Sequence, residues 1–294
     1  MNGREIGGTM NIVKVYETFP SQEDCLSYLE QVRWPDGPRC PYCGSGKQTP
    51  AKQERRYHCN ACNTSYSVTV QTIFHKTKTD LQRWFLAISL ILNAKKGISA
   101  RQLARDIGVN KDTAWYMAMR IRRAMIEQRE LLQGIVEMDE TYIGGKPRKG
   151  TGQVNKRGRG TKKTPVVGIV QRGGKVKAKP VKNLKGRTLA SLVRENVATD
   201  TATVITDEFS GYIRFARFTN HQVVNHRAWY VDGDNHTNTI ESFWALLKRG
   251  IVGQYHKVSV RYLPKYIDEF CYRYNNRNHQ DLFGQTIGRA LGVI

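Results

Sequence analysis

The sequence predicts an α/β domain in its second half, preceded by a cysteine-rich module and a helical region. Three observations support this prediction. Two CxxC pairs lie between residues 40 and 62, two helical apolar stripes lie between residues 80 and 125, and short alternating apolar segments begin at residue 134. Because the pattern changes from one stretch to the next, we expect three modules that span residues 1–76, 77–132 and 133–294.

The composition indicates a polyanionic partner. The 294 residues include 47 lysines and arginines against 25 aspartates and glutamates, which gives a formal charge of +22. Such an excess favours nucleic acid, with an anionic membrane surface as the weaker alternative. No apolar run approaches the length of about 20 residues that spans a bilayer, and the N-terminus lacks the apolar centre of a secretory signal. We therefore expect no membrane span.

Four of the six cysteines predict a structural zinc site. They form two CxxC pairs joined by a short basic stretch, which is typical of a zinc ribbon in a chain without a secretory signal. Each CxxC turn presents two thiolates, and two such turns complete a tetrahedral ion. The expected ligands are Cys40, Cys43, Cys59 and Cys62. The other two, Cys25 and Cys271, fall in helical patterns and are expected to be buried as small apolar groups.

Local signals flank the cysteine-rich stretch. Residues 20–33 predict a helix that Ser21 caps, with Asp24 in its first turn. Residues 66–75 alternate between apolar and polar side chains, so they predict a strand that completes the ribbon.

The next region predicts helices. Asp80 precedes an apolar stripe that continues to Leu92, with aromatic residues that favour packing over base stacking. Farther on, Ser99 begins a capped helix, Gly108 gives a sharp turn, and a second helix follows. This is a helix-turn-helix pattern, whose second helix would place Lys111 and Trp115 near a DNA groove, although plain helical hairpins share the pattern.

From residue 134 the chain predicts three strands, a helix and a further strand. That order is typical of an α/β domain of the ribonuclease H type, in which the first and fourth strands lie side by side. Asp139 ends an apolar run in the first strand, and Asp207 ends one in the fourth. We therefore expect these two carboxylates to meet at adjacent strand ends.

A third carboxylate, Glu241, lies on a predicted helix seven residues before Lys248, so the two share one helix face. With Asp139 and Asp207 it would hold two Mg²⁺ or Mn²⁺ ions. Paired ions of this kind stabilise both the attacking and the leaving oxygen of a phosphodiester. Lys248 would contact the DNA, or else complement the helix dipole.

Other acidic and amide residues compete for these roles. Glu140 adjoins Asp139 but points to the opposite face of the strand. Glu137 shares the face of Asp139 and ranks second because it lies farther from the strand end. Asn238 precedes Glu241 by three residues, so either of them could be the third metal ligand.

A glycine-rich loop between the first two strands carries many cations and no acidic residue. Such a loop is too charged to pack in a core, and we expect it to contact a phosphate backbone. Its cations are Lys146, Arg148, Lys149, Lys156, Arg157, Arg159, Lys162 and Lys163.

The motifs together resemble a known family. CPYC and CNAC, the helix-turn-helix pattern, MDETYIGGK, ITDEFSGY and HTNTIESFWALLKRG are similar to bacterial insertion-sequence transposases of the DDE superfamily, in the zinc-ribbon group related to Merlin elements. The likeness covers about residues 15–280. It implies that the chain binds terminal inverted repeats and catalyses Mg²⁺-dependent cleavage and strand transfer. Asp139 and Asp207 match the first two acidic positions, and Lys248 matches the basic residue after the third.

Such a reaction brings two DNA ends together, so we expect a homo-oligomer, at least a dimer, that acts on double-stranded DNA. The expected location is the bacterial cytoplasm, at the nucleoid. Two alternatives remain at the level of sequence. The chain could be a nuclease of the same fold that does not join ends, or a DNA-binding regulator with a vestigial core.

Overall fold

The computed structural model describes residues 10–51, 55–127, 130–145, 158, 160–224 and 236–293. The chain divides into two compact units. The first comprises Met1–Met125 together with Asn278–Ile294, and the second comprises Ile126–Arg277. The predicted boundary at residue 76 does not separate units, because the cysteine-rich module and the helical region lie in the same one.

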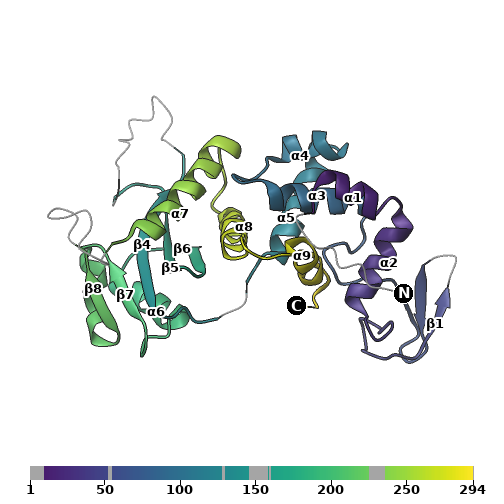
Figure 1. Cartoon of the computed structure of the whole chain (residues 1–294), viewed down its shortest axis with the longest axis horizontal. Coiled ribbons are helices and arrows are strands. Elements are labelled where there is room, and N and C mark those ends of the chain that lie inside the picture. The colour runs from purple at the N-terminus through teal and green to yellow at the C-terminus, as the bar shows by residue number, and fades with distance from the viewer. Residues whose placement is uncertain are drawn as a thin grey trace. The chain divides into compact units, whose positions relative to one another are not determined.

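In the residues that the structure describes, the first unit contains a small sheet and six helices (Figure 1). Its three strands form an antiparallel sheet in the order β1-β2-β3. The strands are β1 (Gln48–Ala51), β2 (Arg56–Cys59) and β3 (Thr64–Tyr66), and the helices are α1 (Ile12–Thr18), α2 (Gln22–Arg33), α3 (Leu81–Asn93), α4 (Ala100–Ile107), α5 (Lys111–Ala124) and α9 (Leu282–Leu291).

Helix α9 corrects the predicted boundary of the third module, which placed residues 278–294 with the α/β domain. Phe283 of α9 packs against Phe85, with ring centroids 5.6 Å apart, and against Phe19 at 6.2 Å. The Ile73 backbone N–H also donates to the Ala290 carbonyl at 3.1 Å. The C-terminal helix therefore completes the core of the first unit.

Most of the local helix signals are confirmed. The Ser21 hydroxyl accepts from the Asp24 backbone N–H at 3.2 Å and the Asp24 carboxylate accepts from the Ser21 backbone N–H at 3.1 Å, so α2 has the predicted cap. Between α4 and α5, Gly108 adopts φ +66°, where a glycine carries no steric cost. Two helices joined by a tight turn are thus present at the predicted residues, and their role as a DNA-binding helix-turn-helix stays a prediction.

The predicted strand over residues 66–75 is wrong beyond Tyr66. The segment turns instead, and Gln71 has φ +61°. Four of its backbone carbonyls accept hydrogen bonds from two guanidinium groups rather than from a neighbouring strand. Arg33 donates to the carbonyls of Val68 and Val70 at 2.6 and 2.7 Å. Arg120 donates to those of Ile73 and His75 at 2.6 and 2.9 Å.

The second unit is built on a five-stranded sheet with the order β6-β5-β4-β7-β8. Strands β5 and β6 pair antiparallel, β4 and β5 pair antiparallel, and β4, β7 and β8 run parallel. Its elements are β4 (Ile135–Ile143), β5 (Thr164–Gln171), β6 (Val176–Pro180), α6 (Gly186–Asn196), β7 (Thr203–Thr206), η2 (Ser210–Arg217), β8 (Asn220–Val223), α7 (Asn238–Arg249), η3 (Gly250–Gln254) and α8 (Leu263–Asn275).

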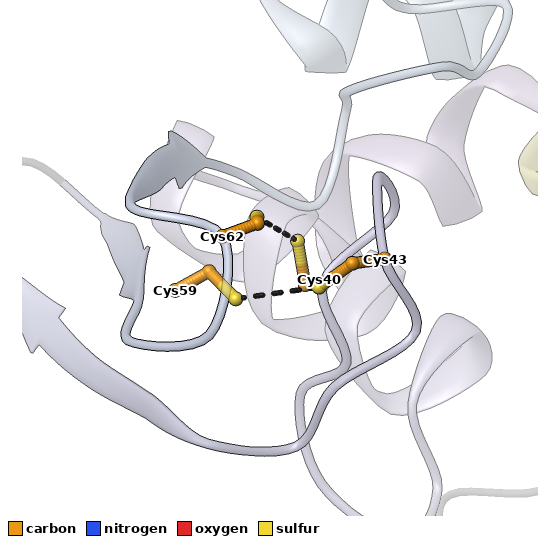
Figure 2. Close-up of side chains that lie close together, drawn as sticks. All are labelled: Cys40, Cys43, Cys59 and Cys62. Carbon is orange, nitrogen blue, oxygen red and sulfur yellow. Dashed lines mark hydrogen bonds between the residues drawn. The ribbon is translucent and has the colours of Figure 1, made fainter.

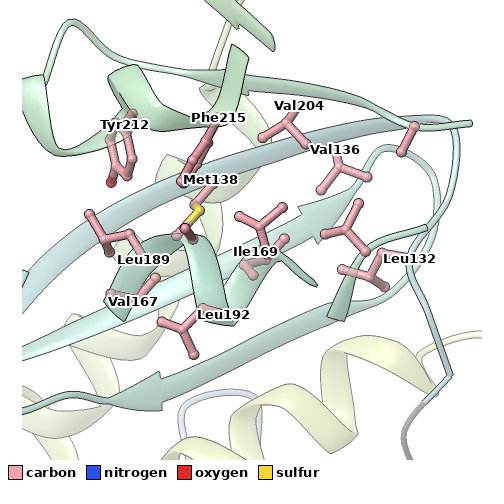
Figure 3. Close-up of a cluster of buried hydrophobic side chains, with 14 residues drawn as sticks. Leu132, Val136, Met138, Val167, Ile169, Leu189, Leu192, Val204, Tyr212 and Phe215 are labelled. Atoms are coloured by element: carbon pink, nitrogen blue, oxygen red, sulfur yellow. The ribbon is translucent and has the colours of Figure 1, made fainter. Parts of the chain in front are cut away.

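The two faces of this sheet carry different chemistry. On one face, Val136 and Met138 of β4 pack with α6 and η2 in an apolar cluster that includes Leu189 and Phe215 (Figure 3). On the other face, the alternate residues of β4 meet helix α7 (Figure 1). The predicted neighbourhood of the first and fourth strands is confirmed, since β4 pairs directly with β7.

Candidate active site and metal centre

The four cysteines of the ribbon converge (Figure 2). All four sulfur atoms lie within 4.8 Å of one another, with Cys40 and Cys62 3.6 Å apart and Cys43 and Cys59 also 3.6 Å apart. Tetrahedral zinc with bonds of about 2.3 Å needs sulfurs about 3.8 Å apart. The donor set therefore fits structural Zn²⁺, as predicted.

The surroundings of Cys59 favour its thiolate. Backbone N–H groups, first that of Cys62 and then that of Ala61, lower the pKa of Cys59 to about 6. Beneath the cluster, Trp34 meets Tyr57 and Tyr66 edge to face, with ring centroids 5.7 and 5.8 Å away. This aromatic base supports the sheet that places the ligands.

We expect the purified protein to contain zinc and the Cys59→Ser variant to lose it, because three ligands hold the ion far more weakly than four. Zinc content by elemental analysis and hydrogen exchange over β1–β3 check this. Cys25→Ser is the matched control, since Cys25 is buried outside the cluster. Zinc retained in Cys59→Ser, or lost in Cys25→Ser, would contradict the assignment.

The second candidate site lies on the sheet of the second unit. Strands β4 and β7 pair in parallel up to Glu137 and Ile205. Asp139 and Asp207 each lie two residues beyond this pair, so they occupy matching positions on adjacent strands. The sequence placed both at strand ends. Asp207 does follow β7 directly, but β4 continues to Ile143, so Asp139 lies in the middle of its strand. The two carboxylates interact electrostatically.

The environment of Asp139 disfavours its charge. Burial, the neighbouring Glu140 carboxylate and the Asp207 carboxylate raise the pKa of Asp139 to about 7. Two hydrogen bonds act in the opposite direction, from the Glu140 backbone N–H and from the indole of Trp244, whose Nε1 donates to Asp139 Oδ2 at 3.0 Å. A nearby cation would restore the ionised form.

Glu137 has a role that the sequence did not indicate. Its fully buried carboxylate accepts from the backbone N–H groups of Thr239 and Ile240 at 2.9 and 3.0 Å, and from the Thr239 hydroxyl at 2.9 Å. Arg172 donates to it at 2.7 Å and also to the His236 carbonyl at 2.8 Å. Glu137 therefore fastens the N-terminus of α7 to β4, and these bonds occupy the oxygens that a metal would need.

The two third-position candidates differ in their contacts. Glu241 is exposed in the first turn of α7 and accepts from the Thr237 hydroxyl at 3.1 Å. The backbone N–H of Asn238 donates to His236 Nδ1 at 3.4 Å, and this residue is also exposed. Lys248 lies exposed two turns beyond Glu241.

Glu140 lies on the other side of β4. Its carboxylate accepts from the Tyr212 hydroxyl at 2.6 Å, and Tyr212 belongs to the cluster that packs with α6. The alternation along the strand thus separates Glu140 from Asp139, which bonds to α7.

Among the residues that the structure describes, the ribbon cysteines are the one group of three or more potential ligands with all ligand atoms within 4.8 Å. Asp139, Asp207 and Glu241 do not form such a group. The structure therefore shows an electrostatic interaction between the Asp139 and Asp207 carboxylates, and the convergence of all three carboxylates on metal ions stays a prediction.

The predicted DNA-contacting residues have varied positions. Lys111 is exposed at the start of α5 beside Asp112, at 3.1 Å, and Trp115 is half-buried on the same helix. Lys162 is exposed and Lys163 is half-buried, close to Gly144. The remaining cations of the basic loop lie outside the described residues: Lys146, Arg148, Lys149, Lys156, Arg157 and Arg159.

The known families that this chain matches are those of DNA transposases with a zinc ribbon. Two family models match the chain: the ISXO2-like transposase domain over residues 131–275 and the transposase zinc-ribbon domain over residues 20–65. An uncharacterized protein in the transposable element ISH50 of Halobacterium salinarum is 30% identical over 275 residues, which cover 87% of this chain and 92% of that protein. The chain belongs to the ISXO2-like transposase family.

Solved structures of the Mos1 transposase are also similar. The pre-cleavage transpososome aligns over 70% of this chain and 75% of that chain, with 13% identity and a TM-score of 0.30. The paired-end complex with Mn aligns over the same shares with 16% identity and a TM-score of 0.30. None of the helices in the described part of the chain has the length and apolar character that a membrane crossing requires.

Proposed function

We propose that this transposase binds the terminal inverted repeats of its element and catalyses metal-dependent cleavage and strand transfer. The observation that carries the proposal is the placement of Asp139 and Asp207 at matching positions on adjacent parallel strands. Burial raises the pKa of Asp139 most, and repulsion from the Glu140 and Asp207 carboxylates raises it further. Divalent cations relieve that repulsion.

The donor set suits Mg²⁺ or Mn²⁺, which bind through one or two carboxylates each and complete their shells with water and phosphate oxygens. Such ions, when bound, would stabilise the charge on the attacking and leaving oxygens of the phosphodiester. The residues of the chain supply the rest. Asp139 and Asp207 would hold the ions from the sheet, and the ammonium group of the exposed Lys248 would pair with a phosphate.

Helix α7 favours Glu241 over Asn238 as the third ligand. The helix runs in the same direction as β4, because Glu137 contacts its start and Asp139 contacts Trp244 farther along. Ile240 lies over Gly168 of β5. Successive residues of a right-handed helix are rotated by about 100° around its axis. The connection from β4 through α6 to β7 is expected to be right-handed, which fixes the side of β4 on which β7 lies. With Ile240 facing the sheet, Glu241 then points toward β7, where Asp207 lies.

The same rotation places Lys248 on the side of Glu241, seven residues later. Asn238 is turned away from the sheet. The carboxylate of Glu241 would exchange its bond with the Thr237 hydroxyl for a metal ion, since Glu241 is exposed and a single hydrogen bond contributes only about 1 kcal/mol.

DNA recognition falls to the first unit and to the basic loop. Helix α5, with Lys111 and Trp115 near its N-terminal end, has the place of a groove-reading helix. The partner of the protein is double-stranded DNA. Because the reaction pairs two DNA ends, it requires at least a dimer of the protein. The basic loop would add phosphate contacts without sequence preference.

The test uses the full-length protein, Mn²⁺ or Mg²⁺, a target plasmid, and terminal-repeat DNA in two forms, uncut to measure cleavage and pre-cleaved to measure joining. We expect joined products that carry the repeat end covalently in the plasmid, and none with a scrambled end. Cleavage without joining would favour a nuclease of the same fold. Binding without either reaction would favour a regulator.

A further inference from the structure

Trp244 makes a contact that the proposed chemistry does not yet explain. Its side chain is buried, with 3% exposed, and its indole Nε1 donates to Asp139 Oδ2 at 3.0 Å. An indole N–H is a donor only, so it can bond to a carboxylate oxygen that carries no proton. The bond joins α7 to the first candidate metal ligand on β4.

The sheet is built to admit this ring. Gly168 of β5 lies directly opposite Asp139 in the β4–β5 ladder. A Cβ atom at Gly168 would lie 2.5 Å from Trp244 Cζ2, 2.6 Å from Cη2 and 2.9 Å from Ile240 Cδ1. Real Cβ atoms do not approach carbon so closely, so any larger residue would displace the ring.

We propose that Trp244 is a positioning residue for the metal-binding carboxylate of Asp139, and that Gly168 is required because it admits the indole. The proposal rests on the proposed function of Asp139. Magnesium demands nearly ideal octahedral geometry, so a carboxylate free to rotate is a poorer ligand than one held by a hydrogen bond. The indole holds Asp139 from the side of β5, while Asp207 lies on the side of β7.

The structure offers a close control. Trp84 in the first unit is also buried, and its indole Nε1 also donates, to the Thr77 hydroxyl at 2.8 Å. Trp84→Phe and Trp244→Phe therefore remove the same group from similarly buried sites. Trp84→Phe breaks the hydrogen bond to the neutral Thr77 hydroxyl, whereas Trp244→Phe breaks the hydrogen bond to Asp139, a candidate metal ligand.

The experiment measures Mn²⁺ binding to the zinc-loaded, full-length protein by titration calorimetry without DNA, and then joining activity against Mn²⁺ concentration. We expect Trp244→Phe to weaken Mn²⁺ binding about 10–100-fold, the usual effect of losing a partner of a metal ligand. Joining would recover at high Mn²⁺. Gly168→Ala would act in the same direction, and Trp84→Phe would leave Mn²⁺ affinity unchanged.

Wild-type Mn²⁺ affinity in Trp244→Phe would overturn the proposal. If that variant does not fold, the ¹⁵N indole resonance of Trp244 decides, because Asp139→Ala removes the acceptor of the indole N–H and should shift that resonance. An unshifted resonance would also overturn the proposal. Full joining activity of Asp139→Asn would instead refute the proposed function, which separates the two failures.

Discussion

Asp139→Asn is expected to abolish both cleavage and joining while DNA binding persists. The substitution keeps the size of the side chain and its capacity to accept from the Trp244 indole, but removes the charge that attracts a divalent ion. Residues that act as one catalytic unit lose most of the activity when one is removed, so we expect a fall of roughly 10³-fold or more. Single-turnover assays with uncut and with pre-cleaved ends measure cleavage and joining, and gel-shift assays with terminal-repeat DNA measure binding separately.

Glu140→Gln is the matched control for this change. It removes the adjacent carboxylate, which bonds to Tyr212 on the other face of the sheet. We expect joining to stay near the wild-type rate, and Asp207→Asn to behave like Asp139→Asn. Equal losses in Glu140→Gln and Asp139→Asn would show that the acidic side chains of β4 act through stability alone, and would remove Asp139 from the reaction.

Much of the catalytic core could be predicted from the sequence because its signals are local. Apolar alternation identified β4, β5 and β7, and the order of elements placed β4 beside β7. The zinc site was predicted as readily, since a CxxC spacing almost dictates the geometry of two thiolates on one ion.

One strand that was not predicted and two mistaken predictions have physical causes that no local pattern contains. Strand β8, with the sequence NHQV, lacks apolar alternation because it lies at the sheet edge and pairs only with β7. Residues 67–75 alternate like a strand, but Arg33 and Arg120 bind their carbonyls from distant helices. The C-terminal helix α9 follows the catalytic core in sequence and yet packs in the first unit.

The catalytic site was predicted only in part. The alternation along β4 correctly placed Glu137 and Asp139 on one face, but it could not show that Glu137 serves α7. That role depends on Arg172, which comes 35 residues later, and on backbone N–H groups of Thr239 and Ile240. Trp244 was overlooked, although its position three residues after Glu241 and four before Lys248 was a usable signal.

Glu137→Ala is expected to destabilise the second unit by about 3–5 kcal/mol, because it removes one partner of a buried ion pair and leaves the other behind. The Glu137 carboxylate is fully buried, and the Arg172 side chain is only 18% exposed. The change also deprives the N–H groups of Thr239 and Ile240 of their acceptor at the start of α7. Since α7 carries Glu241 and Lys248, we expect joining activity to fall with stability.

Cys271 allows this effect to be measured in the second unit alone. It is the one cysteine between residues 126 and 277, and its side chain is buried with 8% exposed. Burial also raises the pKa of its thiol, which slows alkylation in the folded state. Pulsed alkylation of Cys271 across a urea series, read by mass spectrometry, gives the free energy of unfolding of this unit.

Glu195→Gln provides the matched comparison within the same unit. Glu195 pairs with Lys179 at 3.2 Å, but both side chains are about half exposed, at 54% and 52%. Exposed pairs contribute no more than about 1 kcal/mol, so the Cys271 transition should move little. If the urea transition of Cys271 in Glu137→Ala lies as close to the wild-type transition as that in Glu195→Gln, α7 is held to the sheet by its apolar face alone. Glu137 would then no longer explain how the helix that carries Glu241 is fixed to the sheet.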